Sequence, residues 1–129
     1  MMNIGEAARA TSVSAKMIRY YESIGLLPKA GRSSSGYRTY GHTELHDLRF
    51  IRRARDLGFG IEEIRKLLDL WRDRDRDNAE VKAIAQRHVR ELEQKIAALT
   101  AMRRALSHLA ACCAGDGRPD CPILEELGS

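Results

Sequence analysis

Three cysteines carry most of the chemistry that this sequence offers, and all of them lie near its C-terminus. Cys113 and Cys121 are eight positions apart, and they flank a segment with two glycines and a proline that can fold back so that both sulfur atoms meet one ion. Two thiolates suit a soft monovalent ion, Cu(I) above all, whereas a divalent ion normally takes three or four ligands. The spacing therefore predicts a Cu(I) site at Cys113 and Cys121.

Cys112 and His108 leave other interpretations open. Cys112 adjoins Cys113 and could be a bystander, a spare ligand or a route of metal entry. His108 lies four positions before Cys112, so that both could face one side of a helix and help to hold a divalent ion. A redox sensor that uses the three thiols is a weaker alternative. A disulfide framework is disfavoured, because the cysteine count is odd and the chain is expected to be cytoplasmic.

The excess of positive charge lies entirely in the N-terminal half of the chain. Residues 1–60 contain ten Lys and Arg against five Asp and Glu, whereas residues 61–129 contain twelve against thirteen. A basic half of this kind is a candidate for binding phosphate groups, although a solvated basic surface would give the same count.

Two short helices with a four-residue turn between them are predicted near the N-terminus. The first covers residues 3–10, and the second begins after Ser14, whose hydroxyl can cap it. This spacing is typical of a helix-turn-helix. Lys16, Arg19 and Tyr20 project from the second helix away from its apolar side, as donors do on a helix that enters the major groove of DNA.

A short hairpin, or wing, is predicted over residues 31–41. Two glycines and a run of three serines make its turn, and the segment after them is β-prone. The hairpin would carry Arg32 and Arg38. Of its side chains, those of Arg38 and Tyr40 could reach the DNA backbone beside the groove.

Three longer helices are expected to follow. Thr43 can cap a helix that continues to residue 57, and residues 61–71 form the next, with Trp71 among its inward side chains. Residues 79–111 contain neither Gly nor Pro and repeat apolar side chains at intervals of three or four, as a coiled coil does. Such a helix would be about 50 Å long, which is too long for a small head to cover. We expect it to pair antiparallel with the same helix of a second chain, although it could instead fold back onto its own head.

These elements predict a mainly α fold with three parts. A winged helix-turn-helix head with hinge helices would cover residues 1–76, a coiled-coil dimerisation helix residues 77–111, and a metal-binding loop with a short C-terminal helix residues 112–129. No stretch could span a membrane and no signal peptide begins the chain, so we expect a cytoplasmic protein. No nucleophile beside a base, no phosphate loop and no paired carboxylates appear, so we do not expect an enzyme.

Two short runs are more specific than spacing alone. They are Ile18–Glu22 (IRYYE) and Gly36–Tyr40 (GYRTY). Together with residues 4–8 and 51–59, these runs resemble the MerR family of transcription regulators. The resemblance covers the whole chain, and within the family the chain is similar to the copper-efflux regulators.

The resemblance implies how the chain would act. It implies DNA contacts from the recognition helix and from the wing, through Lys16, Arg19, Tyr20, Arg32, Tyr37, Arg38 and Tyr40. It implies a homodimer that sits between the promoter elements, and metal binding that makes this dimer distort promoter DNA so that RNA polymerase can engage it. It further implies activation of copper-efflux genes, with Ag(I) and Au(I) as additional candidate inducers.

One family position bears on the choice of metal. The copper-type members place their two metal-binding cysteines where Cys113 and Cys121 stand here. At the start of the long helix, members that sense divalent ions carry a third cysteine and copper-type members usually carry serine, whereas this chain has Asn78. The absence of a third sulfur favours Cu(I). A divalent-metal sensor of the same family, for Zn, Cd, Pb or Hg, and a metal-buffering protein with an incidental basic head stay as alternatives.

Overall fold

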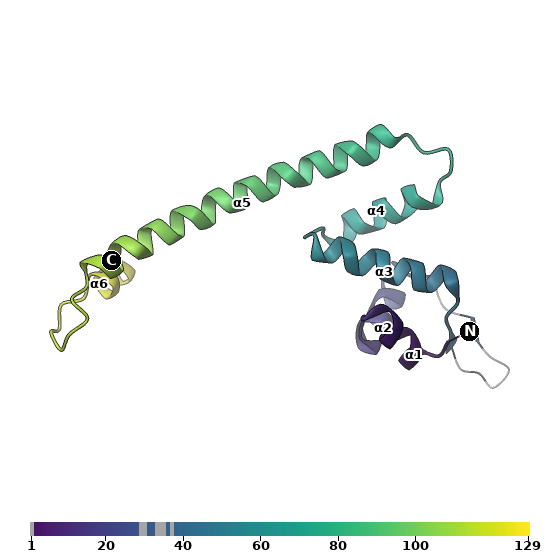
Figure 1. The fold of residues 1–129 in the computed structure, drawn as a ribbon, viewed down its shortest axis with the longest axis horizontal. Coiled ribbons are helices and arrows are strands. Elements are labelled where there is room, and N and C mark those ends of the chain that lie inside the picture. Colours follow the sequence, from purple (N-terminus) through teal and green to yellow (C-terminus); the bar gives the residue numbers. More distant parts are fainter. Residues whose placement is uncertain (1, 29–30, 33–35, 37) are drawn as a thin grey trace. The chain divides into compact units, whose positions relative to one another are not determined.

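The computed structural model describes residues 2–28, 31–32, 36 and 38–129 (Figure 1). Six helices and a two-stranded antiparallel ladder are present in this part of the chain, and the mainly α fold is confirmed. The chain divides into two compact units, residues 1–82 and residues 83–129. In chain order, the elements are α1 (Ile4–Thr11), α2 (Ala15–Ser23), β1 (Gly31–Arg32), β2 (Arg38–Thr39), α3 (His42–Asp56), α4 (Ile61–Arg72), α5 (Asn78–Cys112) and α6 (Pro122–Gly128).

Local hydrogen bonds set the ends of the first two helices. Asn3 caps α1, because its side chain accepts from the N–H of Glu6 while the Glu6 carboxylate accepts from the N–H of Asn3. Ser12 then takes a left-handed conformation with φ of 57° and turns the chain. Ser14 caps α2 as predicted, since its hydroxyl accepts from the N–H of Met17 at 3.2 Å. The two helices thereby form the predicted helix-turn-helix.

A single apolar core holds α1 to α4 together. α3 begins at His42, one residue before the predicted cap Thr43, because Gly41 occupies the cap position and its N–H donates to the Glu44 carboxylate. The prediction that Trp71 points inward is wrong, since this side chain is 50% exposed at the last turn of α4. The buried core residues are Ala7, Val13, Ile18, Tyr21, Leu26, Leu27, Tyr40, Leu45, Leu48, Ile51, Ala54, Ile64 and Leu68.

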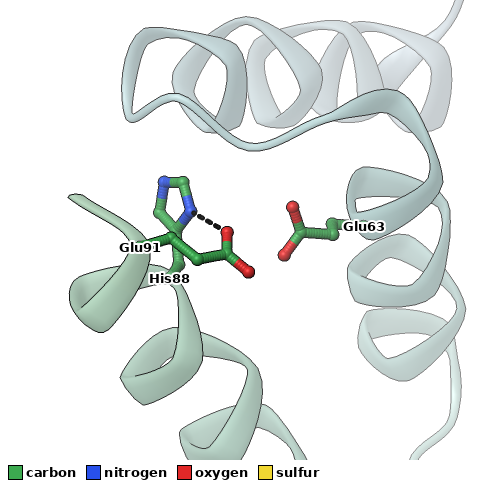
Figure 2. Close-up of side chains that lie close together, drawn as sticks. All are labelled: Glu63, His88 and Glu91. Atoms are coloured by element: carbon green, nitrogen blue, oxygen red, sulfur yellow. Dashed lines mark ion pairs between the residues drawn. The ribbon is translucent and has the colours of Figure 1, made fainter. Parts of the chain in front are cut away.

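The unit of residues 83–129 consists of most of α5, a loop and α6. α5 is one unbroken helix of 35 residues. One turn holds His88, whose Nδ1 lies 3.7 Å from a carboxylate oxygen of Glu91 (Figure 2). Further along, α5 exposes a stripe of apolar side chains, namely Val89, Ile96, Leu99, Met102 and Leu106. Among the described residues, none of the helices has the combination of length and apolar character that crossing a membrane requires.

Candidate DNA-binding and metal-binding sites

The exposed side of α2 carries the three residues predicted for the recognition helix. Lys16, Arg19 and Tyr20 are all exposed. On the opposite side, Ile18 and Tyr21 are buried and hold the helix against the core. Two cations and a phenol on one open helix face are the donor types that contact bases and phosphates in a DNA groove.

A buried carboxylate connects α2 to the wing. Glu22 has only 3% of its side chain exposed, and its Oε2 lies 2.7 Å from Nη1 of Arg38 on β2. Its other oxygen accepts a hydrogen bond from the hydroxyl of Tyr40. A buried carboxylate needs partners of this kind, because an uncompensated charge in the core is strongly destabilising. Glu22 was not predicted as a site residue. It follows Tyr21 on the buried side of α2, and this position in the sequence could have indicated its role.

Tyr40, which the sequence predicts to contact DNA, lies in the core of the head. Its side chain is fully buried, and its backbone N–H and carbonyl oxygen both form hydrogen bonds with the backbone of Met2. Burial, followed by the hydrogen bond to Glu22, raises the pKa of Tyr40 to about 12. The DNA contact of Tyr40 stays a prediction, and in the structure its hydroxyl is bonded to Glu22, which also binds Arg38 of β2.

The rest of the predicted wing surface is only partly described. Arg38 keeps 38% of its side chain exposed beyond its bond to Glu22, so that other guanidinium donors stay accessible. Arg32 lies in β1, where its backbone pairs with that of Arg38. Tyr37, also predicted to contact DNA, lies outside the described residues.

An arginine of α3 supports the turn of the helix-turn-helix. Nη1 of Arg52 donates to the carbonyl oxygen of Ser12 at 2.9 Å. Arg52 and Arg55 line an open cleft of about 360 Å³ that also contains Ser14 at the start of α2. Local spacing could not predict this bond, because it joins residues 40 positions apart in the sequence.

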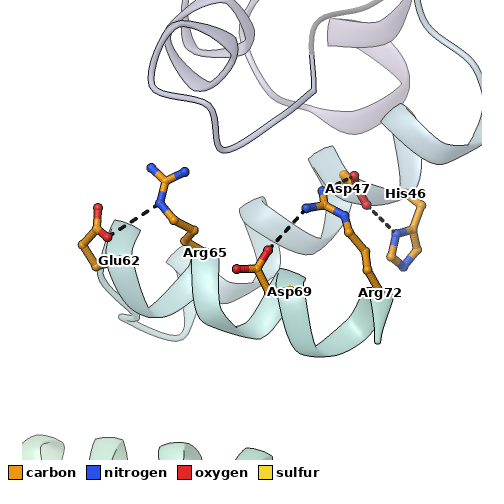
Figure 3. Close-up of polar contacts among 6 residues, drawn as sticks. All are labelled: His46, Asp47, Glu62, Arg65, Asp69 and Arg72. Carbon is orange, nitrogen blue, oxygen red and sulfur yellow. Dashed lines mark hydrogen bonds and ion pairs between the residues drawn. The ribbon is translucent and has the colours of Figure 1, made fainter. Parts of the chain in front are cut away.

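A second polar cluster joins α3 to the end of α4 (Figure 3). Asp47 is buried on α3, and its carboxylate accepts from Nη2 of Arg72 at 2.8 Å and lies 3.1 Å from Nδ1 of His46. The rings of His46 and Trp71 stack with centroids 4.7 Å apart. Arg65 of α4 donates to the carbonyl oxygen of Ile24 at 2.9 Å, which ties α4 to the end of α2. The contacts of Asp47 and His46 thus join α3 to α4, and the bond of Arg65 joins α4 to the end of α2.

The two predicted metal ligands lie close together at the far end of the chain. Cys113 follows α5 directly, Cys121 precedes α6, and both are half-buried. The backbone N–H of Leu124, followed by that of Ile123 and the thiol of Cys113, lowers the pKa of Cys121 against the opposing effect of burial. A lowered pKa favours the thiolate, which is the form that binds metal. The pair therefore fits a soft ion that takes two sulfur ligands.

The loop between the cysteines has its own internal support. The carboxylate of Asp116 accepts from the backbone N–H of Arg118 at 3.0 Å and from its Nε at 2.7 Å. These two bonds, the backbone one first, lower the pKa of Asp116. Gly115 has φ of 64°, a conformation that glycine adopts at little cost. The loop thus returns the chain from α5 to α6.

Comparison with known sequences decides the family. Residues 2–71 match the family described as "MerR HTH family regulatory protein", and residues 45–109 match "MerR, DNA binding". The chain belongs to the MerR family. It is therefore a DNA-binding transcription regulator, and this family is not a class of enzymes.

Named relatives extend the similarity over the whole chain. The HTH-type transcriptional regulator HmrR of Sinorhizobium medicae is 63% identical over 126 residues, covering 98% of this chain and 86% of that protein. CueR of Escherichia coli is 44% identical over 126 residues, covering 98% and 93%. The crystal structure of PbrR691 from Ralstonia metallidurans in complex with lead(II) has a TM-score of 0.85 at 35% identity, covering 98% and 99%. The MerR family member described here is thus similar to metal-dependent regulators along its full length.

Proposed function

We propose that this MerR family member is a Cu(I)-responsive transcription activator that binds promoter DNA as a homodimer. In this proposal residues 1–76 form the DNA-binding head with its hinge helices, residues 77–111 the dimerisation helix, and residues 112–129 the metal-binding segment. Cys113 and Cys121 are its metal ligands. The observation that carries the proposal is this pair of neighbouring thiols, one of which has a lowered pKa.

Support for the choice of Cu(I) comes from the donor set. Cys113 and Cys121 would hold Cu(I) through their two thiolates, and the bound ion would link the end of α5 to the start of α6. Asn78, the first residue of α5, offers no sulfur, and its side-chain oxygen accepts from Nε of Arg76 at 3.2 Å. The resemblance to copper-efflux regulators favours the same ion class, with Ag(I) and Au(I) as further candidates.

Support for the homodimer comes from the exposed stripe of α5. Val89, Ile96, Leu99, Met102 and Leu106 are each more than half exposed in a single chain. Covering such a row of side chains is favourable, because apolar surface is removed from water. A second copy of α5 in antiparallel orientation presents the same stripe, so a closed two-fold dimer covers both.

Support for DNA binding comes from the head. Lys16, Arg19 and Tyr20 would enter the major groove, while Arg38 and the wing residues Arg32 and Tyr37 would contact the flanking backbone. Metal binding at Cys113 and Cys121 would bias the dimer toward a form that distorts the promoter so that RNA polymerase engages it. A cytoplasmic location follows from this role, and a metal-buffering protein would have no use for such a head.

The second candidate is a sensor of divalent ions. The solved relative PbrR691 was crystallised with lead(II), and it is 35% identical to this chain over almost its whole length. A divalent ion would need ligands beyond the two thiols, from Cys112 or from another residue. The two candidates therefore differ in how many sulfur atoms the inducing ion requires.

Transcription in a purified system separates these candidates. Promoter DNA from upstream of a copper exporter, RNA polymerase and the reduced full chain are combined with Cu(I), Zn(II) or Pb(II). We expect activation by Cu(I) only, its loss in Cys113→Ser and in Cys121→Ser with DNA binding of the metal-free protein retained, and its persistence in the matched variant Cys112→Ser. Equal activation by Zn(II) or Pb(II), or loss of activation in Cys112→Ser alone, would contradict the Cu(I) assignment.

A further inference from the structure

The last turn of α5 holds a thiol and an imidazole that the Cu(I) site does not use. Cys112 and His108 are four residues apart on the helix, and both are exposed. Sγ of Cys112 lies 3.8 Å from Nε2 of His108. Because helix geometry places positions i and i+4 on one face, the two donors are held together by the backbone itself.

The separation of these two atoms fits a shared ion. Zinc lies about 2.3 Å from a thiolate sulfur and about 2.0–2.1 Å from an imidazole nitrogen, so two such ligands at tetrahedral to trigonal angles are roughly 3.5–3.8 Å apart. The observed 3.8 Å falls within this interval. An ion could therefore bind both atoms with little change of either side chain.

This pair is distinct from the pair formed by Cys113 and Cys121. The thiol of Cys113 interacts with that of Cys121 and is half-buried, whereas Cys112 is exposed. The N–H of Cys113 donates to the carbonyl oxygen of Leu109 at 3.1 Å, so the helical hydrogen-bond pattern continues past Cys112. Adjacent helical residues point about 100° apart, which separates the two neighbouring sulfur atoms into different sites.

We propose that Cys112 and His108 form a second metal site, open to solvent, for a borderline divalent ion of the Zn(II) class. A thiolate and a neutral imidazole are common protein ligands of this class, and water can complete the coordination at an exposed position. Such a site would hold a divalent ion at the end of α5 and would not involve the two sulfur atoms of the proposed Cu(I) site. The inference goes beyond the proposed function and does not depend on it.

The test uses Co(II) as a spectroscopic stand-in for Zn(II) in the full-length, reduced protein without oxygen. In the double variant Cys113→Ser and Cys121→Ser, we expect one Co(II) per chain and a sulfur-to-cobalt charge-transfer band. Adding Cys112→Ser should abolish the band. Adding His108→Ala should weaken Co(II) binding by at least about tenfold, since loss of a direct ligand costs no less than loss of a residue that supports one.

Controls decide between a metal site and a mere S–H···N hydrogen bond. His42→Ala removes another exposed histidine, on α3, and should leave Co(II) binding unchanged. Zn(II) should displace the bound Co(II). Absence of the band, or equal Co(II) binding with and without Cys112, would overturn the second site. Because the double variant has lost both proposed Cu(I) ligands, failure of the Cu(I) assignment would not alter this result.

Discussion

The head and the C-terminal unit bury their side chains in different ways. Among the described residues of the head, thirteen form one buried core, and the buried carboxylates of Glu22 and Asp47 are each paired with an arginine. In the C-terminal unit, five large apolar side chains of α5 are exposed, and the thiols lie at the surface or half-buried. The head is complete as a single chain, whereas the second unit presents groups that fit a second copy and a metal ion. The difference fits the proposal that the second unit binds the metal, while the first unit contains the part that matches the family's helix-turn-helix.

The largest expected effect comes from placing charge on the exposed stripe of α5. The double variant Ile96→Asp and Leu99→Asp should convert a dimer into a monomer, because two carboxylates would be desolvated at the helix pair. Loss of the linked second head should weaken operator binding by at least about 100-fold. Sedimentation and DNA binding measure the two effects. Gln94→Asp, on an exposed position outside the stripe, should stay dimeric, and a monomeric parent protein would contradict the pairing.

A smaller effect, confined to the head, is expected from Glu22→Ala. The change leaves the buried hydroxyl of Tyr40 without its acceptor and removes the partner of Arg38. The free energy of unfolding should fall by about 3 kcal/mol, as measured by urea denaturation. Glu62→Ala provides the matched control. The Glu62 carboxylate also pairs with an arginine, at 3.6 Å from Nε of Arg65, but it is exposed to solvent. Its effect should stay within about 0.5 kcal/mol; equal losses would show that Glu22 does not support the wing.

Removal of a recognition-helix donor should affect DNA binding but not folding. Arg19→Ala should weaken binding to the specific operator by about 1–3 kcal/mol if the guanidinium contacts a base. Arg9→Ala, an exposed arginine on α1, is the control and should bind nearly as well as the parent. Fluorescence anisotropy at fixed salt measures both. An unchanged affinity for Arg19→Ala would remove this residue from the DNA interface.

The smallest effect expected is the delayed ionisation of one tyrosine. Burial and the hydrogen bond to Glu22 raise the pKa of Tyr40 to about 12, so this phenol should ionise at a higher pH than a free tyrosine does. A folded-state pKa raised above the usual value of about 10 gives stability that is present below pH 10 and is lost as the pH rises toward 12. Tyrosinate absorbance should therefore show a late step that Tyr40→Phe lacks. A late step that persists in Tyr40→Phe would assign it to another residue.

Local patterns in the sequence were enough to predict most elements of the fold. The apolar spacing of α2 and α5, the cap at Ser14 and the resemblance of two short runs predicted the helix-turn-helix head and the long helix. Such features depend on residues a few positions apart, which the chain brings together as soon as a helix forms. The predicted roles of Lys16, Arg19, Cys113 and Cys121 stay proposals, although the exposure of the first two and the proximity of the last two fit those roles.

Contacts between distant segments were decided only by the tertiary structure. The inward position predicted for Trp71 is wrong, because this side chain is exposed and stacks on His46. The burial of Tyr40, and its hydrogen bond to Glu22, also could not be predicted from local spacing. Glu22 lies 16 positions from Arg38, and Asp47 lies 25 positions from Arg72. No local pattern encodes such pairs, because a buried charge acquires its partner only when separate helices and strands pack together. The sequence determined which segments form helices, and packing decided which polar side chains support the fold and which face solvent.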